Sequence, residues 1–311
     1  IGNGHVPVVF ADLSHIEEIK PSHFFGFGLS YSVSLDKWSL SDAAADYVYI
    51  GEQKINFELP GTIGVVCSYE NWKENYSTKT GFYPVITKEL ISHFSTNDVF
   101  FVNHDAENFQ VDYLSNYPKA VLIIESHYTN KTQLLRALYT ALQRGSIKNP
   151  VILSDTPQTN DGETFQLWSS SSLGSLFIDG FGDGIWLKGK VPTQLINSTS
   201  FGILQVTRQR ISKTEYISCP SCGRTLFDLQ ETTGKIREKT SHLKGLKIGI
   251  MGCIVNGPGE MADADYGYVG TGVGKIHLYK EQNVVRKNIP EAEAVDALIE
   301  LIKESGDWIE R

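Results

Sequence analysis

Short runs of β-branched and aromatic residues recur along the first two thirds of the chain and alternate with longer mixed segments. Several runs are continuously apolar, which is typical of strands buried on both faces. Strands that alternate with helical segments predict right-handed β–α–β units and a parallel sheet. About eight or nine strands in roughly 200 residues favour a trimmed (β/α)8 barrel of the TIM type over a small open sheet. The runs are Val8–Phe10, Phe24–Leu29, Tyr47–Ile50, Ile63–Val66, Val99–Val102, Val121–Ile124, Val151–Leu153, Leu176–Ile178 and Ile185–Leu187.

Two helices are expected in this part of the chain. Leucines recur on one helical face of Lys131–Arg144, and Gly145 closes the segment. A second helix is expected over Ser200–Arg210. The glycine-rich stretch Asp179–Gly184 lacks the glycine order and the following helix of a dinucleotide site, so we interpret it as a tight loop.

Polar residues follow several of the predicted strands, at the end where barrels of this type place their active sites. No two of these groups form a spacing with a defined chemistry, so we interpret them as helix caps and turn residues. The groups are Asn103-His104-Asp105, Glu125-Ser126-His127, Ser154-Asp155 and Asp179-Gly180.

The composition changes near Lys213, which places a domain boundary between residues 1–213 and 214–311. The second part begins with a cysteine motif and continues into a polar helical stretch over about Leu226–His242. Strands are expected at Lys247–Ile250 and Ile276–Tyr279, and an amphipathic helix at Glu291–Lys303, started by a proline. These elements predict a smaller α+β domain.

Size and charge exclude several classes of protein. The chain has 311 residues, with 28 Lys and Arg against 36 Asp and Glu and a net charge of −8. An acidic chain without a basic run is not expected to bind nucleic acid. No apolar stretch approaches the roughly 20 residues of a membrane-spanning helix, so no membrane association is expected. The N-terminus Ile1–His5 has no Met and no targeting signal, which indicates a fragment or a processed product of a cytoplasmic protein.

The four cysteines indicate a metal centre rather than a disulfide scaffold. Cys219 and Cys222 form a CxxC motif, and Cys253 follows at the end of a predicted strand. Cys67 lies far away in another predicted strand and is interpreted as a buried core residue. Three thiolates are one short of the four ligands of a structural zinc ion or of an iron–sulfur cube.

The fourth ligand stays open at this point. His242, His277, Glu260 and water are the candidates, and Glu260 lies in the same loop as Cys253. A carboxylate binds the iron of a sulfide cluster weakly, which suits a catalytic cluster that frees one iron for substrate. An electron carrier would use a fourth durable ligand instead. The alternatives are a zinc-stabilised scaffold or binding protein and a closed electron-transfer cluster.

The cysteine segments closely resemble those of the 4-hydroxy-3-methylbut-2-en-1-yl diphosphate synthases, iron–sulfur enzymes of the non-mevalonate isoprenoid pathway. The resemblance rests on Ser218-Cys-Pro-Ser-Cys-Gly-Arg224, on Met251-Gly-Cys-Ile-Val-Asn-Gly-Pro-Gly-Glu260 and on the acidic residues of Ala262–Asp265. It extends from Thr214 to about Lys303.

The resemblance implies a [4Fe–4S] cluster held by Cys219, Cys222, Cys253 and Glu260, with Asn256 close to it. It also implies a cluster domain like a sulfite-reductase or ferredoxin-like module. The substrate of the family is 2-C-methyl-D-erythritol 2,4-cyclodiphosphate. Two electrons from ferredoxin or flavodoxin open its ring and remove a hydroxyl as water, giving 4-hydroxy-3-methylbut-2-enyl diphosphate. Glu260 is then expected to leave the iron and to take part in proton transfer.

Residues 1–213 do not carry the substrate-binding signatures of the family's catalytic barrel. Gly174–Gly184 and Ser200–Leu204 instead resemble the extra barrel of the three-domain form, which is thought to act as a spacer. The chain is therefore expected to lack the N-terminal catalytic barrel of the same protein and to turn over substrate poorly or not at all. Gly270–Lys275 lacks the spacing of a phosphate-binding loop and is interpreted as a turn-rich loop beside the cluster.

Overall fold

A computed structural model describes residues 1–108, 110, 112–126 and 130–310. The chain divides into two compact units, Ile1–Arg210 and Ile211–Arg311, and each is described by itself. The first holds the parallel barrel expected from the sequence and the second an α+β sheet, so the predicted fold class is confirmed. Every helix in the described part of the chain is too short or too polar to cross a lipid bilayer.

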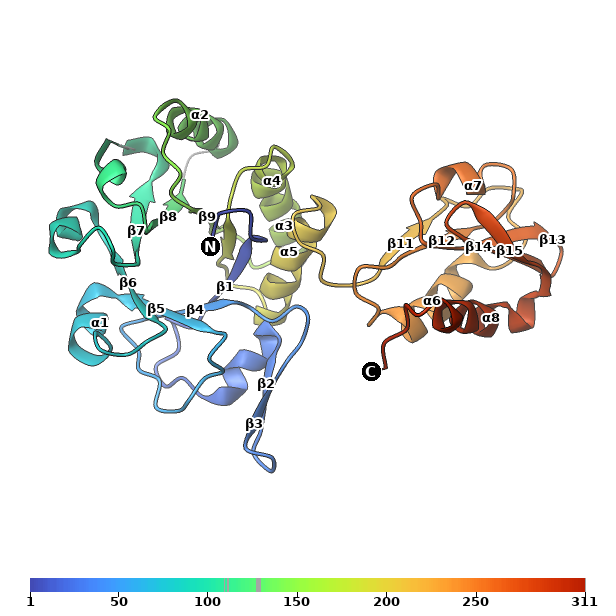
Figure 1. The fold of residues 1–311 in the computed structure, drawn as a ribbon, viewed down its shortest axis with the longest axis horizontal. Helices are drawn as coiled ribbons and strands as arrows, with labels where there is room; N and C mark the ends of the chain where they lie inside the picture. The colour runs from blue at the N-terminus through green and yellow to red at the C-terminus, as the bar shows by residue number, and fades with distance from the viewer. Residues whose placement is uncertain (109, 111, 127–129, 311) are drawn as a thin grey trace. The chain divides into compact units, whose positions relative to one another are not determined.

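The first unit is a closed barrel whose described strands all run parallel (Figure 1). The chain closes it by pairing the first strand with both the last strand and β4. In order around the barrel, the strands are β1 (Val8–Asp12), β4 (Tyr47–Gly51), β5 (Gly64–Ser68), β6 (Phe82–Ile86), β7 (Phe100–Asp105), β8 (Ala120–Glu125), β9 (Val151–Asp155) and β10 (Gly184–Leu187).

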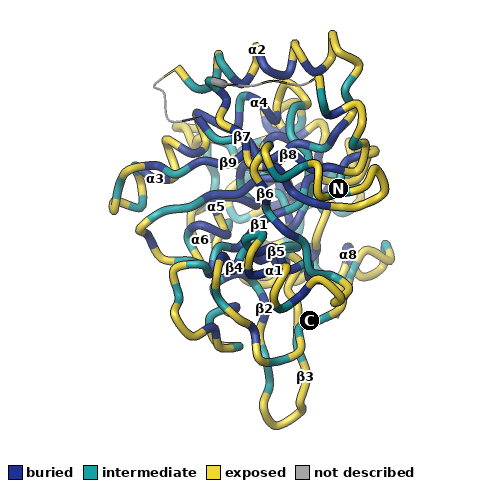
Figure 2. Tube along the Cα trace, turned by 90° about the vertical axis from the view of Figure 1, so that its left-hand side faces the viewer, coloured by how far each residue is buried: buried dark blue, intermediate teal, exposed yellow. Residues whose placement is uncertain are grey.

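The connections are uneven, because several contain only short 3-10 turns. The helical segments of this unit are η1 (Pro21–Phe27), α1 (Tyr69–Asn75), η2 (Lys88–His93), η3 (Ala106–Asn108), η4 (Asp112–Asn116), α2 (Lys131–Arg144), α3 (Gly162–Ser169), the π-helical turn η5 (Ser170–Gly174), α4 (Ser175–Ile178) and α5 (Thr193–Val206). A hairpin of β2 (Leu29–Ser32) and β3 (Lys37–Leu40) projects from the barrel, and most of it is exposed, in contrast to the barrel strands (Figure 2).

Large aromatic side chains fill the barrel interior. Phe10 stacks on Tyr47 and Trp186, with ring centroids 5.0 and 5.5 Å apart, and Phe101 meets Phe10 edge to face. Residues of the opposite strand face, such as Val9 and Leu153, pack outward in the larger cluster that also contains the helices. The continuous apolar runs in the sequence therefore reflect strands that are buried on both sides.

Two predicted strands are wrong. Phe24–Leu29 is mostly the 3-10 helix η1, and Leu176–Ile178 is the helix α4. A short apolar run fits a buried helix as well as a strand, so periodicity does not separate them. The strand β6 was missed, because Pro84 lies inside it. The helix at Lys131–Arg144 has the predicted bounds.

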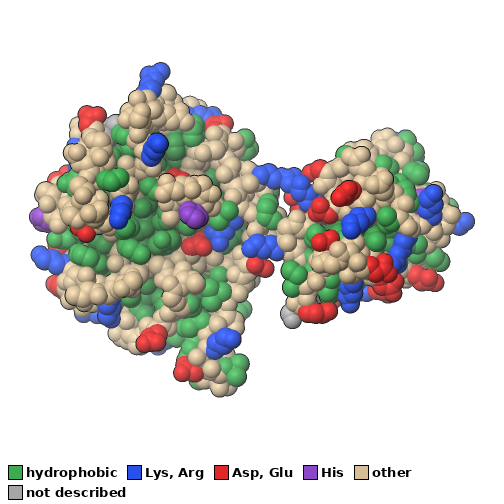
Figure 3. All heavy atoms as spheres, in the orientation of Figure 1, with side chains coloured by type: hydrophobic (Ala, Val, Ile, Leu, Met, Phe, Trp, Pro, Cys, Tyr) green, Lys and Arg blue, Asp and Glu red, His purple; other side chains and the backbone are tan. Residues whose placement is uncertain are grey.

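The second unit is a five-stranded mixed sheet with two long helices. The order is β11 (Glu215–Ser218), β12 (Lys247–Met251), β13 (Tyr266–Gly272), β14 (Lys275–Lys280) and β15 (Asn283–Pro290). The first three strands run parallel and the last two are added antiparallel. Helices α6 (Leu229–Thr240) and α8 (Glu291–Glu304) lie side by side (Figure 1), and their apolar residues share one core with the strands. Acidic and basic side chains are interspersed on the face of this unit that Figure 3 shows.

The stretch Gly270–Lys275 is not a loop, in contrast to our interpretation. It forms the end of β13, a tight turn and the start of β14, with a bulge between Gly270 and Gly272. A side chain at position 270 would lie 2.6 Å from the carbonyl oxygen of Gly252, so close packing between chain segments explains the glycine there.

Candidate functional site: the loops after β11 and β12

The cysteine loops leave the same edge of the second sheet. β11 and β12 are parallel neighbours, with Ser218 opposite Ile250, so their carboxyl ends meet. Cys219 directly follows β11, and its N–H donates to the carbonyl of Ile250 over 3.3 Å. Cys253 follows β12 after a single intervening glycine. The sheet thereby brings two cysteines 34 positions apart in sequence to one edge.

A tight turn holds the CxxC motif. The N–H of Thr225 donates to the carbonyl of Cys222 over 3.0 Å, and the N–H of Cys222 donates to the Thr225 hydroxyl over 3.1 Å. Ser221 has a left-handed backbone conformation with φ 64°. The turn is tied to the end of β12, because the N–H of Leu226 donates to the carbonyl of Gly252 over 3.1 Å.

Gly252 also donates its N–H to the sulfur of Cys219 over 3.2 Å. A side chain at position 252 would lie 2.8 Å from Thr225, which leaves no room for a larger residue. The small residue before Cys253 therefore allows close contact between the two cysteine loops. Gly252 was not among the site residues predicted from the sequence, although its place between strand and cysteine was a signal.

Glu260 and Asn256 belong to the short helix α7 (Gly257–Glu260) that follows Cys253. Asn256 is its N-cap residue, and the N–H of Glu260 donates to the carbonyl of Asn256 over 3.0 Å. Both side chains are exposed, as is Cys222, whereas Cys219 and Cys253 are half-buried.

Arg224 connects these groups electrostatically. Its backbone N–H and its guanidinium bind the thiol of Cys222 and hold the pKa of that thiol below its ordinary value. The hydrogen bond to Cys222 and the charges of Cys222, Cys253 and Glu260 in turn raise the pKa of Arg224. The guanidinium of Arg224 thus interacts electrostatically with two of the thiols and with the carboxylate. Arg224 was not among the site residues predicted from the sequence, although its place as the cation of the Cys219–Arg224 motif was a signal.

The two histidines considered as ligands are engaged elsewhere. The ring of His242 contacts the carbonyl of Ile309 through Nε2 at 2.8 Å and meets the ring of Trp308 edge to face. His277 lies on β14, with its Nε2 3.3 Å from the side-chain oxygen of Asn288. Neither belongs to the loops that follow β11 and β12.

Cys67 lies in the first unit, on β5, and is fully buried. The predicted core position of this cysteine is therefore confirmed. Burial raises the pKa of its thiol to about 12, so it stays protonated at neutral pH.

Among the residues that the structure describes, no three His, Cys, Asp or Glu side chains converge closely enough to hold a single metal ion. A cube-shaped cluster contains four irons, and each iron takes its own protein ligand. The ligands of such a cluster therefore lie farther apart than those of a single ion. Three thiols and a carboxylate at one sheet edge, with a backbone N–H on one sulfur, make a donor set that fits such a group.

Residues 215–304 match the family described as "GcpE protein C-terminal domain". The chain is also similar to proteins named "4-hydroxy-3-methylbut-2-en-1-yl diphosphate synthase (flavodoxin)". It is 42% identical to that of Bacteroides fragilis over 315 residues, which cover 100% of this chain and 47% of the relative. It is 46% identical to that of Parabacteroides distasonis over 266 residues, 85% of this chain and 43% of the relative. The chain spans less than half the length of these relatives.

Proposed function

Because this chain is homologous to part of the 4-hydroxy-3-methylbut-2-en-1-yl diphosphate synthases, we propose that its second unit holds the iron–sulfur centre of such an enzyme. The observation that carries the proposal is the shared edge of β11 and β12, from which both cysteine loops leave. We place this domain at residues 214–311, and the spacer barrel at residues 1–213.

The proposed ligands of a [4Fe–4S] cluster are Cys219, Cys222, Cys253 and Glu260. Soft thiolates suit iron in a sulfide cluster, whereas a carboxylate is a hard and weaker ligand. Such a cluster, when bound, supplies electrons and a Lewis-acidic iron for a substrate oxygen. The exposure of Glu260 supports its role as the ligand that leaves.

Other residues of the site support binding and positioning. The N–H of Gly252 on the sulfur of Cys219 stabilises negative charge there, and hydrogen bonds to cluster sulfurs are one of the factors that set the reduction potential. Arg224 supplies a positive charge beside Cys222, Cys253 and Glu260. We propose that Asn256, the N-cap residue of α7, would lie close to the cluster, and that Glu260 would move a proton when it does not hold the iron.

The proposed reaction is the two-electron ring opening and dehydration of 2-C-methyl-D-erythritol 2,4-cyclodiphosphate in the cytoplasm. Flavodoxin is the electron donor that we favour over ferredoxin, because the names of the relatives carry it. Turnover requires sequence beyond these 311 residues, since the chain spans less than half of its relatives. We propose that a catalytic barrel supplies the diphosphate-binding residues.

The ligand assignment is tested by anaerobic reconstitution with iron and sulfide and by the visible absorbance of the product. Cys219→Ser, Cys222→Ser and Cys253→Ser should each abolish or strongly reduce cluster binding. Cys67→Ala is the matched control, because it removes a cysteine of the other unit and should leave the absorbance unchanged. Full cluster binding by Cys253→Ser in a folded protein would contradict the assignment.

The need for further sequence is tested separately. The reconstituted chain is mixed with the cyclodiphosphate and reduced flavodoxin, and product formation is measured. We expect no turnover by the chain alone. Rapid turnover would show that the first unit, contrary to the proposal, supplies the substrate site.

A further inference from the structure

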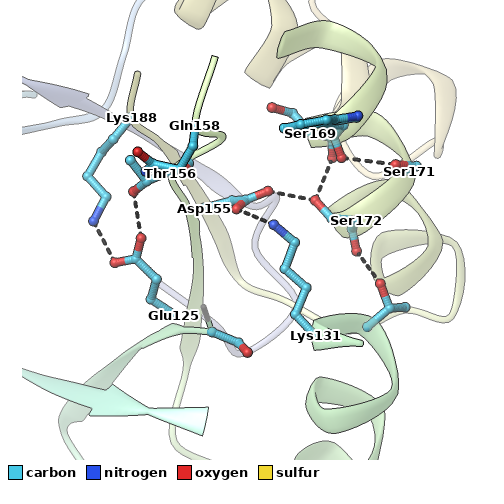
Figure 4. A network of polar contacts seen from close by, with 12 residues as sticks. Glu125, Lys131, Asp155, Thr156, Gln158, Ser169, Ser171, Ser172 and Lys188 are labelled. Carbon is cyan, nitrogen blue, oxygen red and sulfur yellow. Dashed lines mark hydrogen bonds and ion pairs between the residues drawn. The ribbon is translucent and has the colours of Figure 1, made fainter. Parts of the chain in front are cut away.

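Two lysine–carboxylate pairs lie at the carboxyl ends of β8, β9 and β10, in the first unit (Figure 4). Lys131 donates from Nζ to Asp155 Oδ1 over 2.5 Å, and Lys188 donates to Glu125 Oε2 over 2.7 Å. The Asp155 side chain is only 2% exposed and that of Glu125 16%. The interpretation of Asp155 and Glu125 as caps or turn residues is therefore wrong. His127, from the same sequence group as Glu125, lies outside the described residues.

Hydroxyl groups complete the coordination of both carboxylates. Ser172 donates to Asp155 Oδ2 over 2.6 Å, and Thr156 donates to Glu125 Oε1 over 2.5 Å. Both oxygens of each carboxylate are thereby bound, and Figure 4 shows the donors arriving from separate segments. A buried ion pair contributes little net stability compared with apolar packing, so stability alone is a weak reason for this arrangement.

The helix that supplies Ser172 is irregular at this position. The run from Gly162 to Ile178 is helical, but η5 (Ser170–Gly174) winds as a π-helix. Such turns occur mostly as single bulges within α-helices and frequently mark functional sites. Here the wide turn directs the hydroxyl of Ser172 to Asp155, while the neighbouring Ser171 is exposed and lines a cavity at this end of the barrel.

The Lys131–Asp155 part of this network borders a cavity of about 580 Å³ at the carboxyl end of the barrel, which lies within the range of about 300–1,000 Å³ for small-molecule sites. Lys131, Asp155 and Ser172 lie on its wall, together with Trp168, whose ring is half-exposed. Barrels of this type bind their ligands at this end of the strands. Lys131 donates one ammonium hydrogen to Asp155, and its other two N–H groups point to a donor capacity that a ligand can use.

In the part of the chain that the structure describes, the charges around the cavity do not favour an anion. The positive charges of Lys131 and Lys188 are each neutralised by a carboxylate. Glu107 adds a further negative charge near the cavity. Its Oε1 accepts a hydrogen bond from the cavity residue Ser126 over 2.5 Å. A neutral ligand is not repelled by these carboxylates.

We propose that this cavity binds a neutral, polyhydroxylated small molecule of the sugar or polyol class. Neighbouring hydroxyls of such a ligand accept from the ammonium of Lys131 and donate to the hydroxyl oxygen of the exposed Ser171, and both residues line the cavity. The ring of Trp168 offers an apolar face for the C–H groups of the ligand. The proposal concerns the first unit alone and does not depend on the cluster.

The test uses the full 311-residue chain and saturation-transfer NMR with D-glucose, D-ribose and myo-inositol, each added separately, and inorganic phosphate as the anionic probe by a thermal-shift assay. We expect saturation transfer to at least one polyol and no thermal shift with phosphate. Binding of phosphate with no polyol bound, or no binding of any polyol, overturns the proposal.

Variants locate the site. Trp168→Ala removes an exposed side chain and should weaken polyol binding about fivefold, as expected for loss of an aromatic contact. Leu167→Ala is the matched control, because the Leu167 side chain is next to Trp168 in sequence, is also exposed and does not line the cavity. Asp155→Asn removes the charge that positions Lys131 and should weaken binding. If this variant fails to fold, the comparison of Trp168→Ala with Leu167→Ala still decides. Equal affinity of wild type and Trp168→Ala overturns the proposal.

Discussion

Arg210, the last residue of the first unit, binds the residues that directly precede β1 and β4. Its Nη1 donates to Asp46 Oδ2 over 2.5 Å and to the carbonyl of Pro7 over 3.1 Å, and its Nη2 donates to Asp46 Oδ1 over 3.1 Å. Asp46 also accepts the N–H of Val9 over 2.8 Å. The guanidinium lies over the ring of Phe201, 5.0 Å from its centroid. We predict that Arg210→Ala destabilises the first unit substantially.

The magnitude follows from burial and geometry. The two side chains are 16% and 29% exposed, so the pair lies between a buried and a surface ion pair. Breaking a buried pair costs about 3–5 kcal/mol, whereas an exposed pair is worth about 0–1 kcal/mol. The two-pronged contact and the lost bond to Pro7 place Arg210→Ala at about 2–3 kcal/mol. For a unit of this size, that lowers the melting temperature by about 5–10 °C.

Urea unfolding monitored by tryptophan fluorescence measures this loss, because Trp38, Trp72, Trp168 and Trp186 all lie in the first unit. The control is Arg136→Ala, which removes a pair with Asp179 whose side chains are 46% and 35% exposed. We expect the control to lose less than about 1 kcal/mol. An equally small loss for Arg210→Ala would refute the reasoning, since the pair would then behave as an ordinary surface contact.

Three further predictions concern single residues. Because burial raises the pKa of Cys67 to about 12, a thiol reagent at pH 8 should label Cys222 in the native protein but Cys67 only after unfolding; equal labelling rates would contradict this. Burial lowers the pKa of His104, so the unfolded chain binds a proton more readily, and stability should fall as the pH drops below about 6.5. In His104→Gln, the urea midpoint should depend less on pH between pH 7 and pH 5 than in the wild type. An unchanged dependence of the midpoint on pH would refute the cause. Gly28 has φ +81° and no room for a Cβ, so Gly28→Ala should cost at least about 2 kcal/mol in thermal unfolding, whereas Gly61→Ala, with open space, should cost less than about 1 kcal/mol; similar costs would contradict the steric argument.

The barrel could be predicted from the sequence because its strands are buried on both faces and therefore read as continuous apolar runs. The same signal failed where an apolar run was short and helical, as at Leu176–Ile178, and where a proline interrupted a strand, as in β6. In the second unit, the strand β13 was not predicted, because its glycines interrupt the apolar pattern. At position 267 a Cβ would lie 2.4 Å from the end of the Met261 side chain and 3.1 Å from the Cβ of Tyr279, so the glycine there reflects packing that sequence patterns do not reveal.

The cysteine site was predictable as far as spacing and resemblance extend. Cys219, Cys222 and Cys253 could be grouped by type, and the strand ahead of Cys253 was predicted. The hydrogen bond from the Gly252 N–H to Cys219, and the charge of Arg224 beside Cys253, could not be predicted, because both depend on the register of β11 against β12. The ion pairs at the barrel mouth were missed for a similar reason. Lys188 and Glu125 are 63 positions apart and meet only through the order of strands around the barrel.

The central claim is that the second unit holds a [4Fe–4S] cluster. The most direct measurement is a combined assay of iron, acid-labile sulfide and zinc on the anaerobically reconstituted chain. The account predicts about four iron and four sulfide per chain and no stoichiometric zinc. One tightly bound zinc per chain without sulfide would contradict it and would favour a zinc-stabilised scaffold.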